Sequence, residues 1–271
     1  MNDSEIAISA YRPDEKRTRI PTGFAELDQV LGGGFVPSSV LIHGKSSIGK
    51  TTFARQLAYQ MAQENKVAYV SSSHDVYDLV CKALSMYSYI QNPLMAMTAD
   101  EFASKKDWDN LPQEKADFIK AVYDRFKYDA ASKNMTTLND LFDTLNFASN
   151  VHLHPSSPRK PVFGSNICFS DGRIHENMTN GLSVSVITDG VMDSLSWKKN
   201  VSLSSYVIAL KSIGAYTWKS HTDENGNQIA DKIYPIIEAV VERNRYGASG
   251  GTVSFLFINE FSVFVPFDAK P

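Results

Sequence analysis

The stretch Val40-Leu-Ile-His-Gly-Lys-Ser-Ser-Ile-Gly-Lys-Thr51 decides the fold of this 271-residue chain. Residues 44–51 have the spacing G-x-x-x-x-G-K-T, and they lie between a short apolar strand and a predicted helix. Glycines allow successive backbone N–H groups to point toward phosphate oxygens, and the start of the helix adds partial positive charge. The stretch therefore predicts a phosphate-binding loop.

The loop also supplies the contacts that a nucleotide and its metal ion need. Lys50 would reach the β- and γ-phosphates, and the hydroxyl of Thr51 would be a ligand of Mg²⁺. ATP and Mg²⁺ are therefore the expected cofactors. The residues expected to bind the nucleotide are Gly44, Lys45, Ser46, Ser47, Ile48, Gly49, Lys50, Thr51 and Thr52. The alternative is a chance glycine-rich turn, which is expected in on the order of 1% of chains of this length.

The surrounding residues extend the loop into a strand–loop–helix–strand unit. The sequence predicts strands over residues 40–43 and 66–71 and a helix over residues 50–65. Because such crossovers are right-handed, the two strands should be parallel members of one sheet. The fold class is therefore α/β.

Further elements complete the predicted fold. Helices are expected over residues 22–31, 75–89, 98–104, 112–131 and 138–147. Strands are expected over residues 151–154, 182–188, 233–243 and 252–265. We expect residues 1–20 to form a partly mobile arm and residues 21–271 to form one domain.

Composition narrows the classes of protein. The chain has 43% hydrophobic residues and a net charge of −3, so a disordered chain and an overall basic field are excluded. Its two cysteines show neither disulfide nor zinc spacing, and no stretch predicts a signal peptide or a membrane span. These features favour a cytoplasmic protein without a membrane partner.

Two regions carry a family resemblance. Arg19-Ile-Pro-Thr-Gly-Phe-Ala-Glu-Leu-Asp28, Leu31-Gly-Gly-Gly34 and the phosphate loop resemble the entry to the RecA-like core of DnaB-type replicative helicases and RadA (Sms) proteins. Val240-Val-Glu-Arg-Asn-Arg-Tyr-Gly247 resembles the K-N-R-F-G motif of RadA and the K-Q-R-N-G motif of DnaB. The resemblance covers roughly residues 19–90 and 233–265, and the strands over 252–265 look more like DnaB.

The resemblance implies a RecA-like P-loop NTPase with a mostly parallel central sheet, flanking helices and antiparallel strands at the C-terminal end. It also implies a homo-oligomer, either a ring or a filament, with single-stranded DNA as a partner. Arg243 and Arg245 would act on the nucleotide of the neighbouring subunit, since forked, permanently charged donors stabilise charge on the γ-phosphate. The alternative is that both arginines form surface ion pairs with Glu238 or Glu242.

A carboxylate that holds the Mg²⁺ shell should follow a buried strand. Val184-Ser-Val-Ile-Thr-Asp189 fits this pattern, so Asp189 is the preferred metal and catalytic residue. Asn166-Ile-Cys-Phe-Ser-Asp171 is a rival that Gly172 follows directly. The remaining alternative is that Asp189 only starts a turn with Gly190.

The catalytic base is the main departure from the family. Ser73 stands where the resemblance places the glutamate that activates water, and a serine hydroxyl cannot take a proton at neutral pH. Either His74 or Asp75 substitutes for it, or hydrolysis is slow. The structural alternatives are a helix N-cap for Asp75 and a strand end for His74. The predicted function is thus an ATP-hydrolysing DNA helicase or translocase core, or alternatively a catalytically impaired scaffold, loader or regulator.

A candidate DNA-contacting surface lies between the metal carboxylate and the arginines. Four lysines alternate there with four aromatic residues, an arrangement that could line a single-strand channel by charge and stacking. They are Lys198, Lys199, Lys211 and Lys219 with Trp197, Tyr206, Tyr216 and Trp218. The alternative is that the aromatic residues are core and the lysines face solvent.

Overall fold

The computed structural model describes residues 18–71, 76–104, 108, 110–129, 135–139, 167–171, 181–190, 194–218 and 231–267. The helices are α2 (Ala25–Leu31), α3 (Lys50–Met61), α4 (Val76–Gln91), α5 (Ala99–Ala103), α7 (Gln113–Tyr128), α10 (Ser194–Leu203) and the 3₁₀ turn η2 (Asn259–Phe261). The strands are β1 (Ser39–Gly44), β2 (Val67–Ser71), β3 (Met135–Asn139), β4 (Ile167–Asp171), β5 (Leu182–Thr188), β6 (Tyr206–Trp218), β7 (Lys232–Asn244), β8 (Thr252–Ile258) and β9 (Val263–Pro266). Within these residues, no helix has the length and apolar character needed to cross a bilayer.

One sheet organises the domain. Its strand order is β3-β2-β4-β5-β1-β6-β7-β8-β9. The strands from β3 to β6 are mutually parallel, and the pairs from β6 to β9 are antiparallel. This arrangement confirms the predicted α/β fold, with its mostly parallel sheet and antiparallel strands at the C-terminal end. It also confirms that β1 and β2 are parallel, with β5 and β4 inserted between them.

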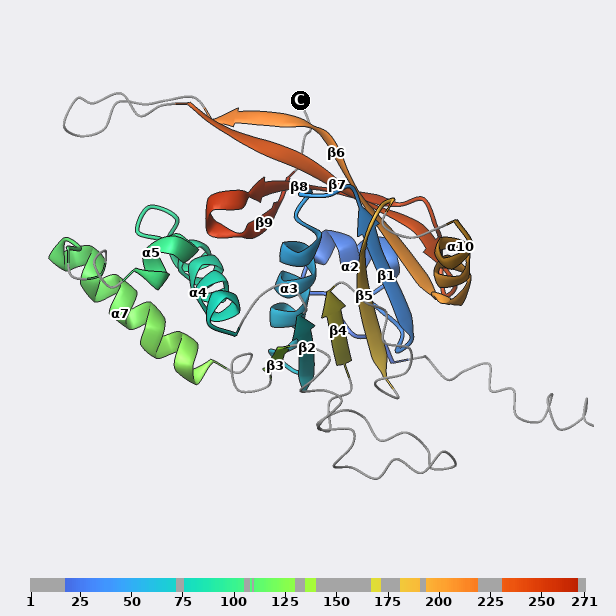
Figure 1. Cartoon of the computed structure of the whole chain (residues 1–271), viewed down its shortest axis with the longest axis horizontal. Coiled ribbons are helices and arrows are strands. Elements are labelled where there is room, and N and C mark those ends of the chain that lie inside the picture. The colour runs from blue at the N-terminus through green and yellow to red at the C-terminus, as the bar shows by residue number, and fades with distance from the viewer. Residues whose placement is uncertain are drawn as a thin grey trace, which may run out of the picture.

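Helices cover both faces of the sheet (Figure 1). On one face, α2 and α3 pack on the strands, and α3 contacts β1, β5, β4 and β2 as well as the edge strand β9. On the other face, Trp197 and Val201 of α10 pack on a small buried cluster of Leu41, Ile187 and Val207. The carboxyl end of β1, where the phosphate loop begins, is therefore enclosed between two helical layers.

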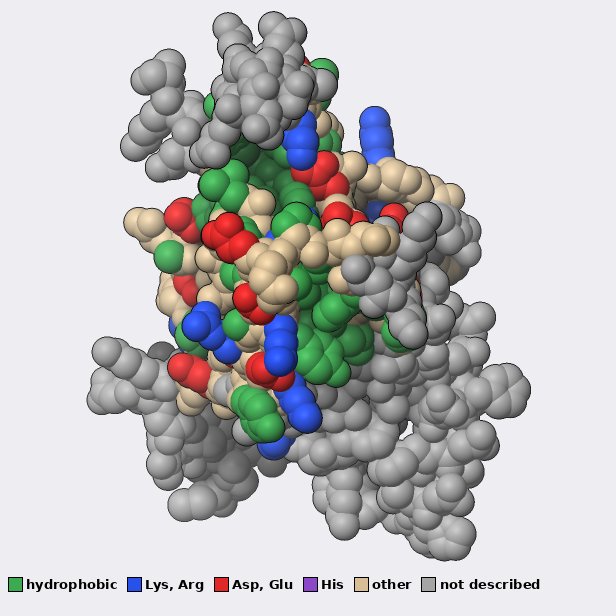
Figure 2. All heavy atoms as spheres, turned by 90° about the vertical axis from the view of Figure 1, so that its left-hand side faces the viewer, with side chains coloured by type: hydrophobic (Ala, Val, Ile, Leu, Met, Phe, Trp, Pro, Cys, Tyr) green, Lys and Arg blue, Asp and Glu red, His purple; other side chains and the backbone are tan. Residues whose placement is uncertain are grey.

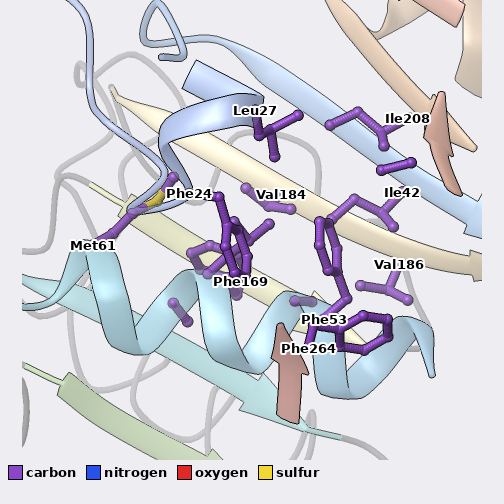
Figure 3. Close-up of a cluster of buried hydrophobic side chains, with 14 of the residues drawn as sticks. Phe24, Leu27, Ile42, Phe53, Met61, Phe169, Val184, Val186, Ile208 and Phe264 are labelled. Carbon is purple, nitrogen blue, oxygen red and sulfur yellow. The ribbon is translucent and has the colours of Figure 1, made fainter. Parts of the chain in front are cut away.

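Aromatic residues fill the core beneath the loop. Phe53 of α3 is fully buried, and its ring centroid lies 5.7 Å from that of Phe24, 5.5 Å from that of Phe255 and 5.3 Å from that of Phe264. Figure 3 shows Phe24, Phe53 and Phe264 in this cluster. The buried amide of Gln56 donates to the carbonyl of Phe264 at 2.9 Å and accepts from its N–H at 2.7 Å. These contacts fix α3 against the last strand of the sheet, because unpaired buried groups would be costly.

The helices α4, α5 and α7 form a satellite layer with its own small core, which includes Phe102 and Ile119. The side chain of Thr98 and that of Glu101 form a reciprocal capping box at the start of α5. Tyr77 and Leu94 are exposed on this layer, at 62% and 94%. Figure 2 shows hydrophobic, basic and acidic side chains interspersed on this face, without a field of one sign.

The stretch Arg19–Asp28, on which part of the family resemblance rests, begins with two residues that hold the fold together. The guanidinium of Arg19 donates to the carbonyls of Leu31 and Gly34 at 2.9 and 3.1 Å, and to that of Tyr246 at 3.2 Å. Ile20 is buried and pairs with Phe35. Arg19 and Ile20 therefore belong to the folded domain and not to the expected arm, while residues 1–17 lie outside the described residues.

Most predicted elements near the termini match the structure, and the middle differs. Residues 138 and 139 end β3, so the predicted helix over residues 138–147 is wrong at its start, and its remainder lies outside the described residues. The predicted strand over residues 151–154 also lies outside them. The strand predicted over residues 252–265 is divided by η2 into β8 and β9.

In addition to β3, three elements were not among those predicted, although residues 166–171 were considered as a rival to the strand before Asp189. β4 forms within a stretch rich in glycine, proline, serine and asparagine, and α10 and β6 fill the segment for which the sequence predicts no elements. β6 pairs with β1 along its first five residues and with β7 along nearly its whole length. Beyond the sheet, β6 and β7 continue together as a two-stranded arm (Figure 1).

Candidate nucleotide site at the phosphate loop

The predicted phosphate loop joins the carboxyl end of β1 to the first turn of α3. Ser47 has a φ of +60° and Gly49 a φ of +90°, and left-handed residues of this kind are typical of loops whose successive N–H groups bind anions. Lys45, Ser46 and Ser47 are exposed, whereas Ile48 is buried and anchors the loop. The loop therefore has the backbone conformation and the exposed position of an anion-binding turn at a helix N-terminus.

The glycines of the motif also allow close packing. A Cβ atom on Gly44 would lie 2.6 Å from the carbonyl oxygen of Leu210, and one on Gly49 would lie 2.8 Å from the ring of Phe264. Phe264 stacks on Phe257, with ring centroids 4.6 Å apart. The aromatic pair of β8 and β9 thus packs against Gly49 of the loop. The C-terminal strands therefore support the loop in its position.

Lys50 is buried at the centre of the loop. Its ammonium donates to the carbonyl of Lys45 at 2.6 Å, across the loop. Burial lowers the pKa of Lys50 below its ordinary value, and the negative charge of Asp189 acts in the opposite direction. A phosphate group would supply the negative partner that this position favours. Thr51 and Thr52 follow in the first turn of α3, and both are partly buried.

The two candidate carboxylates end neighbouring strands. Asp189 follows β5, which lies directly beside β1, and its N–H donates to the carbonyl of Gly44 at 3.0 Å. Asp171 is the last residue of β4, one strand farther from the loop, and pairs in register with Val186. Asp189 therefore lies at the mouth of the phosphate loop. The oxygen donors of Asp189 and Thr51 are of the kind that Mg²⁺ prefers.

A histidine before the loop connects Asp189 to the antiparallel strands. His43 lies 2.9 Å from a carboxylate oxygen of Asp189 through Nδ1 and 3.0 Å from one of Glu242 through Nε2. Lys211 of β6 donates to the other oxygen of Glu242 at 3.0 Å. Burial acts to raise the pKa of Glu242, but hydrogen bonds from His43 and Lys211 outweigh it and lower that pKa. The sequence analysis did not identify this network, since its members are 146 and 199 residues apart.

A cavity of about 420 Å³ adjoins this network. It is lined by His43, Thr188, Asp189, Gly190, Ser194 and Trp197. The ring of Trp197 lies edge-on to His43, with centroids 4.8 Å apart. The cavity therefore opens beside the phosphate loop on the face of the sheet that α10 covers.

Arg243 of β7 and Arg245, the first residue after that strand, contact helix α10. Arg243 donates to the carbonyl of Val201 at 2.6 Å, and Arg245 donates to that of Ser202 at 2.5 Å. Cations at a helix C-terminus interact favourably with its unpaired carbonyls. The ion pair considered between these arginines and Glu242 is not formed in the described residues, since Glu242 instead contacts His43 and Lys211.

The predicted DNA-contacting residues divide into two groups. Tyr206 is fully buried, and its hydroxyl accepts a hydrogen bond from the N–H of Val36, so it cannot serve as a stacking platform. Trp197 is partly buried against His43. Tyr216 and Trp218 are exposed on the two-stranded arm of β6 and β7, at 39% and 54%. Lys198, Lys199 and Lys211 are exposed, and Lys219 lies outside the described residues.

The candidate bases are not among the residues that the structure describes. Ser73, His74 and Asp75 all fall in the gap between β2 and α4. Their roles therefore stay predictions from the sequence.

Comparison of sequences supports the N-terminal part of the resemblance. Residues 19–140 match the family described as the DnaB-like helicase C-terminal domain. Seventy residues are 40% identical to the DNA repair protein RadA of Escherichia coli K12, covering 26% of this chain and 15% of RadA. Sixty-nine residues are 49% identical to RadA of Mycobacterium tuberculosis H37Rv, covering 24% and 14%. The chain thus spans about 15% of the length of these relatives.

Solved structures resemble the whole chain. One that is described as an ATPase domain superposes with a TM-score of 0.58 at 16% identity, over 98% of this chain and 96% of that one. A DnaB-like replicative helicase gives 0.60 at 17% identity, over 99% of this chain and 67% of that one. A KaiC-like protein from Pyrococcus horikoshii OT3 gives 0.53 at 12% identity, over 93% and 99%. These likenesses confirm the RecA-like fold.

Proposed function

We propose that this chain, whose core is of the RecA-like DnaB and RadA type, binds ATP with Mg²⁺ at residues 44–52 and hydrolyses it to drive movement along single-stranded DNA. The observation that carries the proposal is the phosphate loop, in which the buried Lys50 at the start of α3 extends its ammonium across the loop to the carbonyl of Lys45. Such a constellation binds a triphosphate and stabilises charge on its terminal phosphoryl group.

Each residue of the site has a distinct proposed role. Lys50 contacts the β- and γ-phosphates in place of the carbonyl of Lys45, which it contacts in this structure. Thr51 and Asp189 hold the Mg²⁺ shell, and the metal would neutralise charge on the phosphates. Asp189 is proposed over Asp171 because it lies on the strand beside the loop and its charge acts on Lys50. His74 or Asp75 would accept the proton of the attacking water.

We further propose that Arg243 and Arg245 act on the nucleotide of a neighbouring subunit, in a homo-oligomeric ring or filament. Their contacts with the end of α10 hold both guanidinium groups at the end of β7 in the isolated chain. Replacing a carbonyl by phosphate oxygens would convert neutral hydrogen bonds into stronger charge-assisted ones. The arginines can therefore exchange partners when a neighbouring nucleotide comes within reach.

A subunit-mixing experiment tests this proposal. Lys50→Ala subunits keep both arginines but lack the nucleotide contact, and Arg243→Ala/Arg245→Ala subunits have the reverse defect. Each variant alone should show background ATP turnover. A one-to-one mixture should regain activity, because random assembly brings the two intact halves together at about one interface in four.

The mixture separates catalysis from folding. The double arginine variant also loses its contacts with α10, but such damage within one subunit would not be repaired by a neighbour. Lys120→Ala, which removes an exposed lysine from α7, should leave turnover unchanged. A mixture that stays at background, although both variants assemble with the parent protein, would contradict action between subunits.

The alternative is a nucleotide-binding scaffold, loader or regulator that does not hydrolyse ATP. The observation that favours it is Ser73, which cannot act as a base at neutral pH. The retained Lys50, Arg243 and Arg245 favour the enzyme, because a protein that only binds nucleotide has little use for arginines that stabilise charge during transfer.

Single-stranded DNA is the proposed partner of the exposed aromatic and basic residues. Tyr216 and Trp218 present rings for stacking on the two-stranded arm of β6 and β7, where Lys232 lies opposite Trp218 in register. Residues 21–271 are proposed to act as one domain in the cytoplasm.

A further inference from the structure

His43 occupies an unusual position for a polar side chain. It is the residue before the first glycine of the loop, it is only 8% exposed, and it ends the run of apolar residues in β1. A buried imidazole needs partners for both ring nitrogens. Here each nitrogen faces a carboxylate, that of Asp189 on one side and that of Glu242 on the other.

This arrangement makes His43 a bridge between two parts of the sheet. Both ring nitrogens lie within hydrogen-bonding distance of a carboxylate oxygen, so one ring contacts the two carboxylates at the same time. Asp189 ends the parallel strand β5, whereas Glu242 belongs to the antiparallel strand β7. β5 and β7 do not pair with each other, because β1 and β6 lie between them.

The bridge connects the two halves of the proposed ATPase site. The backbone N–H of Asp189 donates a hydrogen bond to the carbonyl of Gly44, and its negative charge acts to raise the pKa of Lys50. Glu242 directly precedes Arg243, whose guanidinium caps α10. Trp197 of the same helix packs edge-on against His43. The phosphate loop, strand β7 with Arg243, and helix α10 therefore all lie next to the buried imidazole of His43.

We infer that His43 is a positioning residue, which holds Asp189 toward the phosphate loop and links it through Glu242 to the strand that carries Arg243. The inference rests on the proposed function and adds a connection between a subunit's own nucleotide and the arginines that it offers to its neighbour. Because Glu242 touches His43 and not the loop, its effect on the nucleotide passes through His43.

A double-mutant cycle tests the link. The affinity for a fluorescent, non-hydrolysable ATP analogue is measured with Mg²⁺ in the parent protein, His43→Asn, Glu242→Gln and the double variant. We expect each single change to weaken binding about fivefold, which is a coupling of ordinary size between distant sites. The double variant should be no weaker than His43→Asn alone, since neighbours in one network are not additive.

Glu260→Gln is the matched control. Glu260 also accepts a lysine contact, from Lys232 at 2.7 Å, but its second partner is Tyr234 instead of His43. It should leave analogue binding unchanged. If His43→Asn does not fold, Glu242→Gln and its control still decide the outcome, because the glutamine keeps the size of the side chain.

Trp197 gives a readout that does not depend on nucleotide. In a protein with Trp108→Phe and Trp218→Phe, the emission of Trp197 should change on Glu242→Gln and stay constant on Glu260→Gln. Unchanged affinity for the analogue in Glu242→Gln would overturn this inference but not the proposed function. The same holds if the losses of affinity in the two single variants multiply in the double variant. Failure of the parent protein to bind the analogue would overturn the proposed function, and the inference with it.

Discussion

Lys50→Ala is expected to weaken ATP binding by about 10- to 100-fold, since hydrogen bonds to charged groups contribute about 1.5–3 kcal/mol each. Turnover should fall to background, because the same ammonium stabilises charge on the transferred phosphoryl group. The measurement is titration with a fluorescent ATP analogue in Mg²⁺, followed by steady-state turnover.

Lys45→Ala is the control for this change. Lys45 lies in the same loop and carries the same charge, but its side chain is exposed and the structure uses only its backbone carbonyl. It should reduce affinity much less than Lys50→Ala. Equal losses in the two variants would indicate a general effect of positive charge and would contradict a specific phosphate contact by Lys50.

Phe53→Ala is expected to lower the free energy of unfolding by about 3–5 kcal/mol, because a fully buried aromatic side chain leaves a cavity that the surroundings fill only in part. The cavity would lie among Phe24, Phe255 and Phe264, under the phosphate loop. Chemical denaturation monitored by circular dichroism measures the loss.

Tyr123→Ala provides the comparison for an exposed aromatic residue. Tyr123 is 48% exposed on α7, so its removal should change stability by less than about 1 kcal/mol. A small effect of Phe53→Ala, similar to that of Tyr123→Ala, would contradict the packing described for the core beneath the loop.

The loop and its flanking elements could be predicted because their signals are local. The spacing of Gly44, Gly49 and Lys50 requires a strand before it and a helix after it, and β1, α3 and β2 form where that requirement places them. The helix that ends at Leu31 is likewise followed by Gly32 in a left-handed conformation. Such patterns determine structure within a few residues.

β6 could not be predicted because its pattern is not that of a half-buried strand. Its first five residues are buried on both faces between β1 and β7, whereas its last eight are exposed. Hydrophobic and polar residues do not alternate along the whole strand. The strand therefore depends on pairing with partners that are distant in the sequence. β4 is short, and its pairing with β2 and β5 is equally non-local.

The sequence predicts site residues one by one only where a motif or a resemblance exists. The loop residues, Asp189 and the arginines follow from spacing and resemblance, but the contacts of Arg243 and Arg245 with α10 required the fold. The bridge through His43 required it even more, since one apolar strand ending in a histidine carries no sign of two carboxylate partners.

The most direct test of the central claim is steady-state ATP turnover by the purified protein, with and without single-stranded DNA, beside Lys50→Ala prepared in the same way. The account predicts turnover that DNA stimulates and that Lys50→Ala abolishes. Turnover at the Lys50→Ala background, in a protein that still binds ATP, would contradict the motor and leave the scaffold in its place.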